Sequence, residues 1–209
     1  MLYLCAALLL SNRLNIEQLV HDIEDVYLTL DKEIATFKKH SGLGCKSGCG
    51  KCCLKPDIEA TILEFIPFAY HLYKQGKAIE WLENPVLNNS LCAILDSSLS
   101  GVGHCTSYAY RGMICRLFGF SAKLNKYGHK ELITCQVIKT EQPGAFLTAY
   151  TETVAGNPVP LMRDYYMKMY AIDWELSQKF YTINTAIRKA IETVLHYYAY
   201  REEEIIVTE

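Results

Sequence analysis

Apolar residues recur every three or four positions along residues 15–37 and again along 180–200, the spacing of an amphipathic helix. The first of these segments is followed by three basic residues and then by Gly42, so we expect its helix to end there. Two further helices are expected at 58–75 and at 158–177, a segment rich in Tyr and Met. Pro67 lies inside the 58–75 segment and predicts a kink.

The segments between these helices have shorter patterns and more turn residues. A short helix is expected at 78–82, and strands at 118–125 and 131–138 form a hairpin around a polar turn. The glycine-rich stretch 42–53 and residues 86–119 predict irregular structure. The predicted fold class is therefore mainly α with a small β-hairpin, in which an irregular cysteine-rich region packs on helices.

We expect one compact domain with three parts. These are an N-terminal helix at 1–40, a cysteine-rich region at 41–138 and a C-terminal helical part at 139–209. Residues 2–10 are all apolar, but no basic residue precedes them and Arg13 follows, which is not the pattern of a secretory signal. They are also far fewer than the roughly 20 that a membrane helix needs. We interpret them as the start of a buried helix or as the product of a misassigned start, and expect a cytoplasmic protein without a membrane partner.

Composition adds one outlier to an otherwise ordinary globular chain. The chain has 209 residues, of which 50% are hydrophobic and 21% charged, and its formal net charge is −2. A chain with this net charge lacks the excess of basic residues that is typical of nucleic-acid-binding proteins. The outlier is nine cysteines, in a chain long enough to bury a core without disulfides. An odd number cannot pair completely, and in a reducing compartment thiolates act as ligands or reagents.

Four of the cysteines form a dense cluster: Cys45, Cys49, Cys52 and Cys53 lie within nine residues. Such spacing lets one loop wrap a single ion or cluster, and the neighbouring glycines permit positive φ. Adjacent side chains diverge, so we expect one of Cys52 and Cys53 to ligate. The other would then serve a second site, a switch or the surroundings of the ligands.

The remaining cysteines are isolated in sequence. Cys92, Cys105, Cys115 and Cys135 are 13, 10 and 20 positions apart, so only tertiary folding can bring them to the cluster. Together with the cluster they provide enough thiols for two tetrahedral sites, or for one site with spare thiols, and either Zn²⁺ or an iron–sulfur cluster takes such ligands. Cys5 is expected to be a small buried hydrophobe.

Basic residues adjoin several of these cysteines and can offset the negative charge of thiolates; they are Lys46, Lys51, Arg111 and Arg116. His104 and His129 are expected on the surface or behind the ligands, because the thiols already exceed the need of one site.

Taken together, these motifs resemble the YkgJ-type cysteine-cluster family, the zinc- or iron-chelating domain of CxxCxxCC type. The resemblance spans residues 41–136 and rests on the cluster, on Leu91-Cys92, and on the run from Cys105 through Arg111 to Cys115-Arg116-x-Phe118. Gly112 replaces the usual proline, and three residues rather than two separate Cys45 from Cys49. The resemblance implies zinc or iron, including a [4Fe–4S] cluster, as the bound group. It implies as metal ligands Cys45, Cys49, Cys52, Cys53, Cys92, Cys105, Cys115 and Cys135.

Two other functions remain open at this point. A similar cluster occurs in the flagellin lysine N-methylase, so a cluster-dependent enzyme is one alternative, acting by redox chemistry or by methyl transfer from S-adenosylmethionine to protein lysine. No glycine-rich nucleotide loop follows a strand here. A metal-free thiol-redox protein is the other alternative.

Overall fold

The computed structural model describes residues 15–46, 48–96 and 104–207, with side chains described as far as Arg201. The expectations for residues 2–10 and for Cys5 lie outside these ranges. The described helices are α2 (Ile16–Ser41), α3 (Ile66–Lys74), α4 (Ala78–Glu83), α5 (Met113–Leu117), α6 (Gln136–Glu141), α7 (Pro143–Val154), α8 (Met162–Ile172), α9 (Trp174–Ser177) and α10 (Ile183–Val207). The short 3-10 helices are η1 (Lys51–Leu54), η2 (Leu63–Phe65), η3 (Pro85–Asn88) and η4 (Tyr108–Tyr110).

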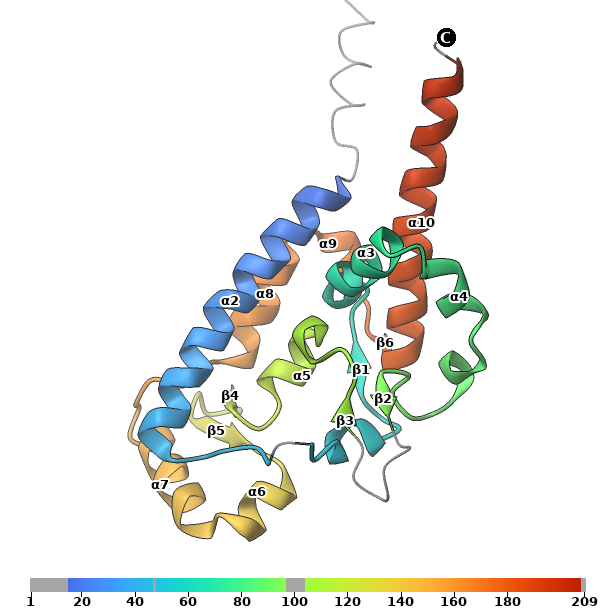
Figure 1. The fold of residues 1–209 in the computed structure, drawn as a ribbon. Helices are drawn as coiled ribbons and strands as arrows, with labels where there is room; N and C mark the ends of the chain where they lie inside the picture. The colour runs from blue at the N-terminus through green and yellow to red at the C-terminus, as the bar shows by residue number, and fades with distance from the viewer. Residues whose placement is uncertain (1–14, 47, 97–103, 208–209) are drawn as a thin grey trace, which may run out of the picture.

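Short antiparallel strand pairs complete the structure, so the prediction of a mainly α fold with a small β-hairpin is confirmed. The pairs are β1 (Glu59–Ala60) with β6 (Tyr181–Thr182), β2 (Leu95–Asp96) with β3 (His104–Cys105), and β4 (Ser121–Leu124) with β5 (Lys130–Ile133). Helices α2 and α8 lie side by side along one side of the molecule, with α3, α4 and α10 along the other (Figure 1). No described helix has the length and apolar character needed to cross a membrane.

The long helix α2 confirms the first helical prediction. Asn15 caps its start, where the side-chain Oδ1 accepts the Gln18 N–H at 2.9 Å. Gly42 ends the helix with φ of 72°, a left-handed conformation that favours glycine. Apolar residues on one face are buried against α3, α7 and α8; they are Ile16, Leu19, Val20, Ile23, Tyr27, Leu30, Ile34 and Phe37.

Helix α3 is packed between α2 and α10, and its neighbourhood forms the centre of the core (Figure 1). Phe65, Ile66 and Phe68 are at most 1% exposed. On α10 the predicted apolar face is buried in its first half, where Ile187 and Ile191 are fully enclosed, and partly buried at Leu195 and Tyr198. The first turn of α2 also contacts the C-terminal half of α10, because the Tyr198 hydroxyl donates a hydrogen bond to the Glu17 carboxylate.

The expected helix at 58–75 is wrong in its first half. Glu59 and Ala60 instead form β1, which pairs with β6, and the Ile183 N–H donates to the Ile58 carbonyl at 2.9 Å. This pairing partner lies far along the chain, so local periodicity could not reveal it. Pro67 lies in the first turn of α3, where its missing N–H breaks no helical hydrogen bond, and therefore causes no kink.

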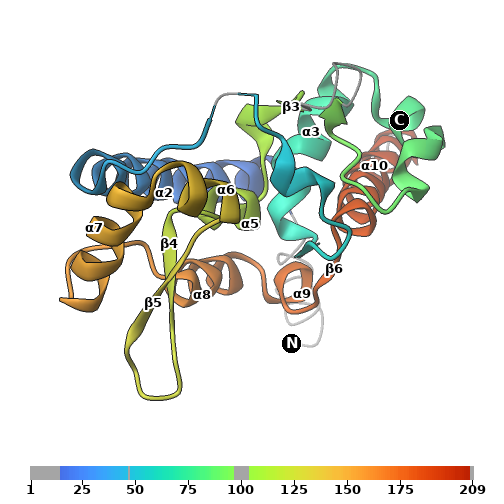
Figure 2. The ribbon, with the colours of Figure 1, turned by 90° about the horizontal axis from the view of Figure 1, so that it is seen from below.

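The predicted hairpin is confirmed, but both of its strands are shorter than expected. Ser121 pairs with Ile133 and Leu124 with Lys130, and the Asn125 side chain accepts two backbone N–H groups in the turn. Seen from below, the hairpin projects beyond the helices (Figure 2). Residues 136–141 form α6 instead of continuing the strand, because the Cys135 sulfur accepts the Ile138 N–H at 3.4 Å and caps a helix.

Other boundaries also differ from the predictions. Residues 86–119 are less irregular than expected, since they contain the β2–β3 pair and α5. The predicted helix at 158–177 begins only at Met162 and is interrupted at Asp173, whose side chain caps α9 by accepting the Leu176 N–H at 2.8 Å. Helix α7 was not predicted.

Arg116 connects α5 to α2 and does not serve the cysteines, contrary to the expectation that it offsets thiolate charge. Its guanidinium is bonded to the Asp31 carboxylate and lies 4.4 Å from the centre of the Tyr27 ring. Its Nε donates to the Arg111 carbonyl at 3.0 Å, and Nη2 donates to the Ala109 carbonyl. The side chain is only 7% exposed. Its planar fork therefore holds the segment before α5 against α2.

We predict that Arg116→Lys lowers the free energy of unfolding by about 2 kcal/mol, because lysine at this nearly buried position cannot bind the Asp31 carboxylate and the two backbone carbonyls together. Urea unfolding followed by circular dichroism measures the change. Arg163→Lys is the matched control, since Arg163 forms an exposed ion pair with Asp164 and should change stability by less than about 0.5 kcal/mol. Equal losses in the two variants would contradict a structural role for Arg116.

Candidate metal centre

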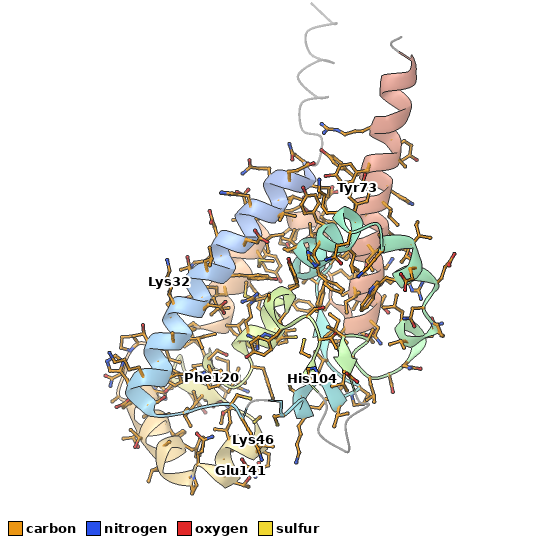
Figure 3. All side chains as sticks on the ribbon, viewed as in Figure 1. Lys32, Lys46, Tyr73, His104, Phe120 and Glu141 are labelled. Carbon is orange, nitrogen blue, oxygen red and sulfur yellow. The ribbon has the colours of Figure 1, made fainter. Side chains whose placement is uncertain are left out.

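The structure brings the predicted cysteines to one end of the molecule from several separate elements. Cys45 and Cys49 lie between α2 and η1. Cys52 and Cys53 lie on η1, Cys105 on β3 and Cys115 on α5. Cys92 precedes β2, and Cys135 caps α6. Lys46 and His104, which neighbour two of the cysteines in sequence, both lie at this lower end (Figure 3).

Glycines shape the loop that carries the cluster, as the sequence predicted. Gly48 and Gly50 have φ of 70° and 53°, a conformation that side chains with a Cβ rarely adopt. Gly50 caps η1, and its carbonyl accepts the Cys53 N–H at 2.9 Å. The tight 3-10 turn leaves Cys52 exposed and Cys53 half-buried, so the adjacent side chains have different surroundings.

Gln142 fixes the start of this loop to the end of α6. Its Oε1 accepts the Gly44 N–H at 2.9 Å, and its Nε2 donates to the Gly44 carbonyl at 2.6 Å. Because Cys135 caps the other end of α6, this helix links the positions of Cys45 and Cys135. Sequence analysis missed Gln142, since a lone glutamine 98 positions away carries no local signal.

Asn184 fixes the segment around Cys92 in the same way. Its Oδ1 accepts the Ala93 N–H at 2.8 Å, and its Nδ2 donates to the carbonyls of Asn89 and Leu91 at 2.8 and 2.7 Å. The side chain is 4% exposed on the first turn of α10. The backbone of Cys92 also meets the cluster, because its N–H donates to the Cys53 carbonyl at 3.3 Å. Sequence analysis missed Asn184 too.

The thiols lie close enough to oppose one another's ionisation. Burial raises the pKa of Cys45, and so do the neighbouring thiols of Cys49, Cys52 and Cys135. A hydrogen bond with Cys53 raises the pKa of Cys52 well above its ordinary value, and burial adds to this effect. The same bond lowers the pKa of Cys53, but its bond to Cys92 and burial raise that pKa to about 12.

Cys105 and Cys115 belong to the same neighbourhood. Burial raises the pKa of each thiol, and Cys52 raises both further. Arg111 lowers the pKa of both, so this predicted cation does face the thiols. Lys38, at the end of α2, similarly lowers the pKa of Cys45. Raised pKa values favour the protonated form of Cys45, Cys105 and Cys115, and a bound cation would stabilise their thiolates.

The division of the cysteines into two groups is our assignment, since Cys52 interacts with members of both. The first group is Cys45, Cys49, Cys52 and Cys135. The second is Cys53, Cys92, Cys105 and Cys115. Within the described ranges, no three Cys, His, Asp or Glu side chains converge closely enough to form a closed ligand shell. The donor chemistry nevertheless fits zinc or iron, since both ions are held by thiolates.

Glu64, on η2, is a buried carboxylate behind Cys115. Its Oε1 accepts the Thr61 N–H at 2.9 Å and its Oε2 accepts the Ile114 N–H at 2.8 Å. Burial raises the pKa of Glu64 to about 7, and the carboxylate in turn raises the pKa of Cys115. A Cβ on Gly112 would lie 3.1 Å from Oε2 and 3.0 Å from the Phe65 ring, which accounts for glycine at this position. The resembled family usually has proline at this position. The φ of Gly112, −62°, is one that proline also adopts, so the replacement keeps the backbone conformation.

Such an assembly of thiols from distant segments is typical of a cysteine-rich metal-binding domain. Residues 44–138 match the family described as "Putative zinc- or iron-chelating domain", whose cysteine pattern is CxxCxxCC. This match agrees with the family that the motifs predicted. No curated protein and no solved structure matches the chain. Gln142 and Asn184 lie beyond the matched residues, although both fix segments that carry the cysteines.

We predict that Asn184→Ala lowers the free energy of unfolding by about 2–3 kcal/mol, because the buried Asn184 side chain is lost and one part-buried N–H and two carbonyls lose their protein partner. It should also expose Cys92, which is 6% exposed in the structure. Urea unfolding and the rate of iodoacetamide modification at Cys92, read by peptide mass spectrometry, measure the two effects. Asn157→Ala removes an exposed asparagine and serves as the control. An unchanged modification rate in Asn184→Ala would show that this side chain does not fix Cys92.

Proposed function

We propose that this protein binds zinc or iron through thiolates of the two cysteine groups defined above. The observation that carries the proposal is that eight free cysteines from separate elements gather at one end, where burial and neighbouring thiols raise the pKa values of Cys45, Cys52, Cys53, Cys105 and Cys115. Neutral thiols with raised pKa values resist ionisation until a cation compensates the charge. The match of residues 44–138 to a chelating domain supports the same conclusion.

In this proposal the first group holds one ion or cluster with Cys45, Cys49, Cys52 and Cys135, and the second with Cys53, Cys92, Cys105 and Cys115. Bound metal would offset the charge of the thiolates, and its bonds to the sulfur atoms would join these segments to one another. The protein residues have separate tasks: Gln142 and Asn184 fix the backbone beside the cysteines, and Arg111 and Lys38 reduce the remaining negative charge. A reducing, cytoplasmic setting belongs to the proposal, because the described cysteines are all free thiols.

We expect the protein to retain tightly bound metal through purification in the absence of oxygen. Elemental analysis and a visible absorption spectrum identify it: colourless protein with zinc indicates thiolate-bound zinc, whereas brown protein with iron and sulfide indicates an iron–sulfur cluster. Parallel purification in air shows whether the bound group is sensitive to oxygen. A folded, metal-free protein with freely titratable thiols would overturn the proposal and favour thiol-redox chemistry.

The two-group arrangement predicts selective losses. Cys49→Ser should remove the metal of the first group and Cys92→Ser that of the second, because each variant deletes a ligand from one group alone. Metal content per folded chain, measured with thiol titration, checks this expectation. Cys5→Ser is the matched control, since this isolated cysteine is expected to be inert. Complete loss of metal from both single variants would instead indicate one shared site, and full retention would exclude the altered cysteine as a ligand.

A further inference from the structure

A cavity of about 450 Å³ lies beside the cysteines. The side chains of Cys52, Cys53 and Cys115 form part of one wall. Its volume falls in the range of about 300–1,000 Å³ that is typical of small-molecule sites. The proposed thiolate sites account for these cysteines but not for the rest of the cavity.

Most of the lining is apolar and aromatic. It comes from both ends of the cysteine region and from the C-terminal helices, and it includes Ile58, Ile114, Phe118, Met162, Tyr166 and Phe180. The Tyr166 and Phe180 rings lie 5.4 Å apart between their centres. Ile114 lies on α5, which Glu64 and Arg116 hold in place, and Tyr166 lies on α8, which packs against α2. The cavity is therefore built on elements of the core, which favours a preformed site.

Charged side chains line the cavity on one segment alone, the stretch from η1 to β1. Lys55, Asp57 and Glu59 are all exposed, so their charged groups lie at the rim. Two carboxylates and one ammonium give this rim a net negative charge. Aromatic faces also attract cations, and three aromatic rings line the wall. Both features favour a ligand that combines an apolar ring system with a positive charge.

We propose that this cavity binds a small organic cation, an amine with an aromatic body. Its ring system packs against Phe118, Tyr166 and Phe180, and its ammonium group lies toward Asp57 and Glu59. The cavity and its rim do not depend on the metal chemistry proposed above. Thiolate-bound metal would nevertheless strengthen the preference for a cation, because four thiolates around a divalent ion leave a net negative charge beside the ligand.

Two naphthalene probes of opposite charge test this proposal on the full-length protein as purified. They are 1-naphthylmethylammonium and 1-naphthylacetate, and isothermal titration calorimetry at low ionic strength measures their affinities. We expect the cation to bind at least about fivefold more tightly than the anion, because attraction to exposed carboxylates at the rim contributes a free energy of this size. Equal affinities, tighter binding of the anion, or no binding of either probe would overturn the proposal.

Variants separate the contribution of the wall from that of the rim. Phe180→Ala should weaken both probes about tenfold, because it removes an aromatic face from the cavity. Tyr127→Ala, at an exposed position on the hairpin, should change neither affinity. Asp57→Asn with Glu59→Gln should abolish the preference for the cation. Glu24→Gln with Asp25→Asn removes the same charge from the exposed face of α2 and should leave the preference intact.

Metal content measured on the same samples keeps the two proposals distinct. Probe binding by a metal-free, folded protein would retain the cavity and overturn the metal site. Metal-loaded protein that binds neither probe would retain the metal site and overturn the cavity. Unchanged affinities in Phe180→Ala would show that the probes bind elsewhere, which would also overturn the proposal.

Discussion

The junction of α2, η2 and α5, which positions Cys115 among the other cysteines, depends on one buried carboxylate, that of Glu64. Its oxygens accept N–H groups from Thr61 and Ile114, while its backbone carbonyl accepts the Tyr27 hydroxyl at 2.8 Å. One residue thus joins α2, η2 and α5, and α5 carries Cys115 into the metal centre. Burying an ionised carboxylate is costly unless hydrogen bonds compensate, which explains why the pKa of Glu64 is raised to about 7 despite three donors from Thr61 and Ile114. Arg116 reinforces the same junction by joining the segment before α5 to Asp31 and Tyr27.

The matched family segment does not position its own cysteines unaided. Gln142 fixes Gly44 from the end of α6, and Asn184 fixes the segment around Cys92 from the first turn of α10. Both amides satisfy backbone groups that loops leave unpaired, which is a recurring requirement wherever irregular backbone is buried. Residues outside 44–138 therefore help to position the cysteines, since they supply hydrogen-bond partners for the backbone of the irregular loops.

The cysteine groups and the cavity beside them share residues. Cys52 and Cys53 face other cysteines and also line the cavity, as does Cys115. A ligand in the cavity would lie against the same sulfur atoms that the proposed function assigns to metal. Charge links the two features, because thiolates and the rim carboxylates both favour positive charge at this end of the molecule.

The sequence by itself determined the helices whose apolar faces are continuous, α2 and the described part of α10, because their periodicity records which face will be buried. It also determined the local cluster at 45–53, whose spacing and glycines sufficed to predict a chelating loop. Only the tertiary structure decided that residues 59–60 pair as a strand with 181–182, that Arg116 faces α2, and that Cys52 borders both cysteine groups. The eight cysteines remain a predicted ligand set, and their division into two groups is part of the proposal. The physical reason is the distance along the chain: Asn184 and Gln142 act on backbone 91 and 98 positions away, where local patterns carry no information and packing alone sets the partner.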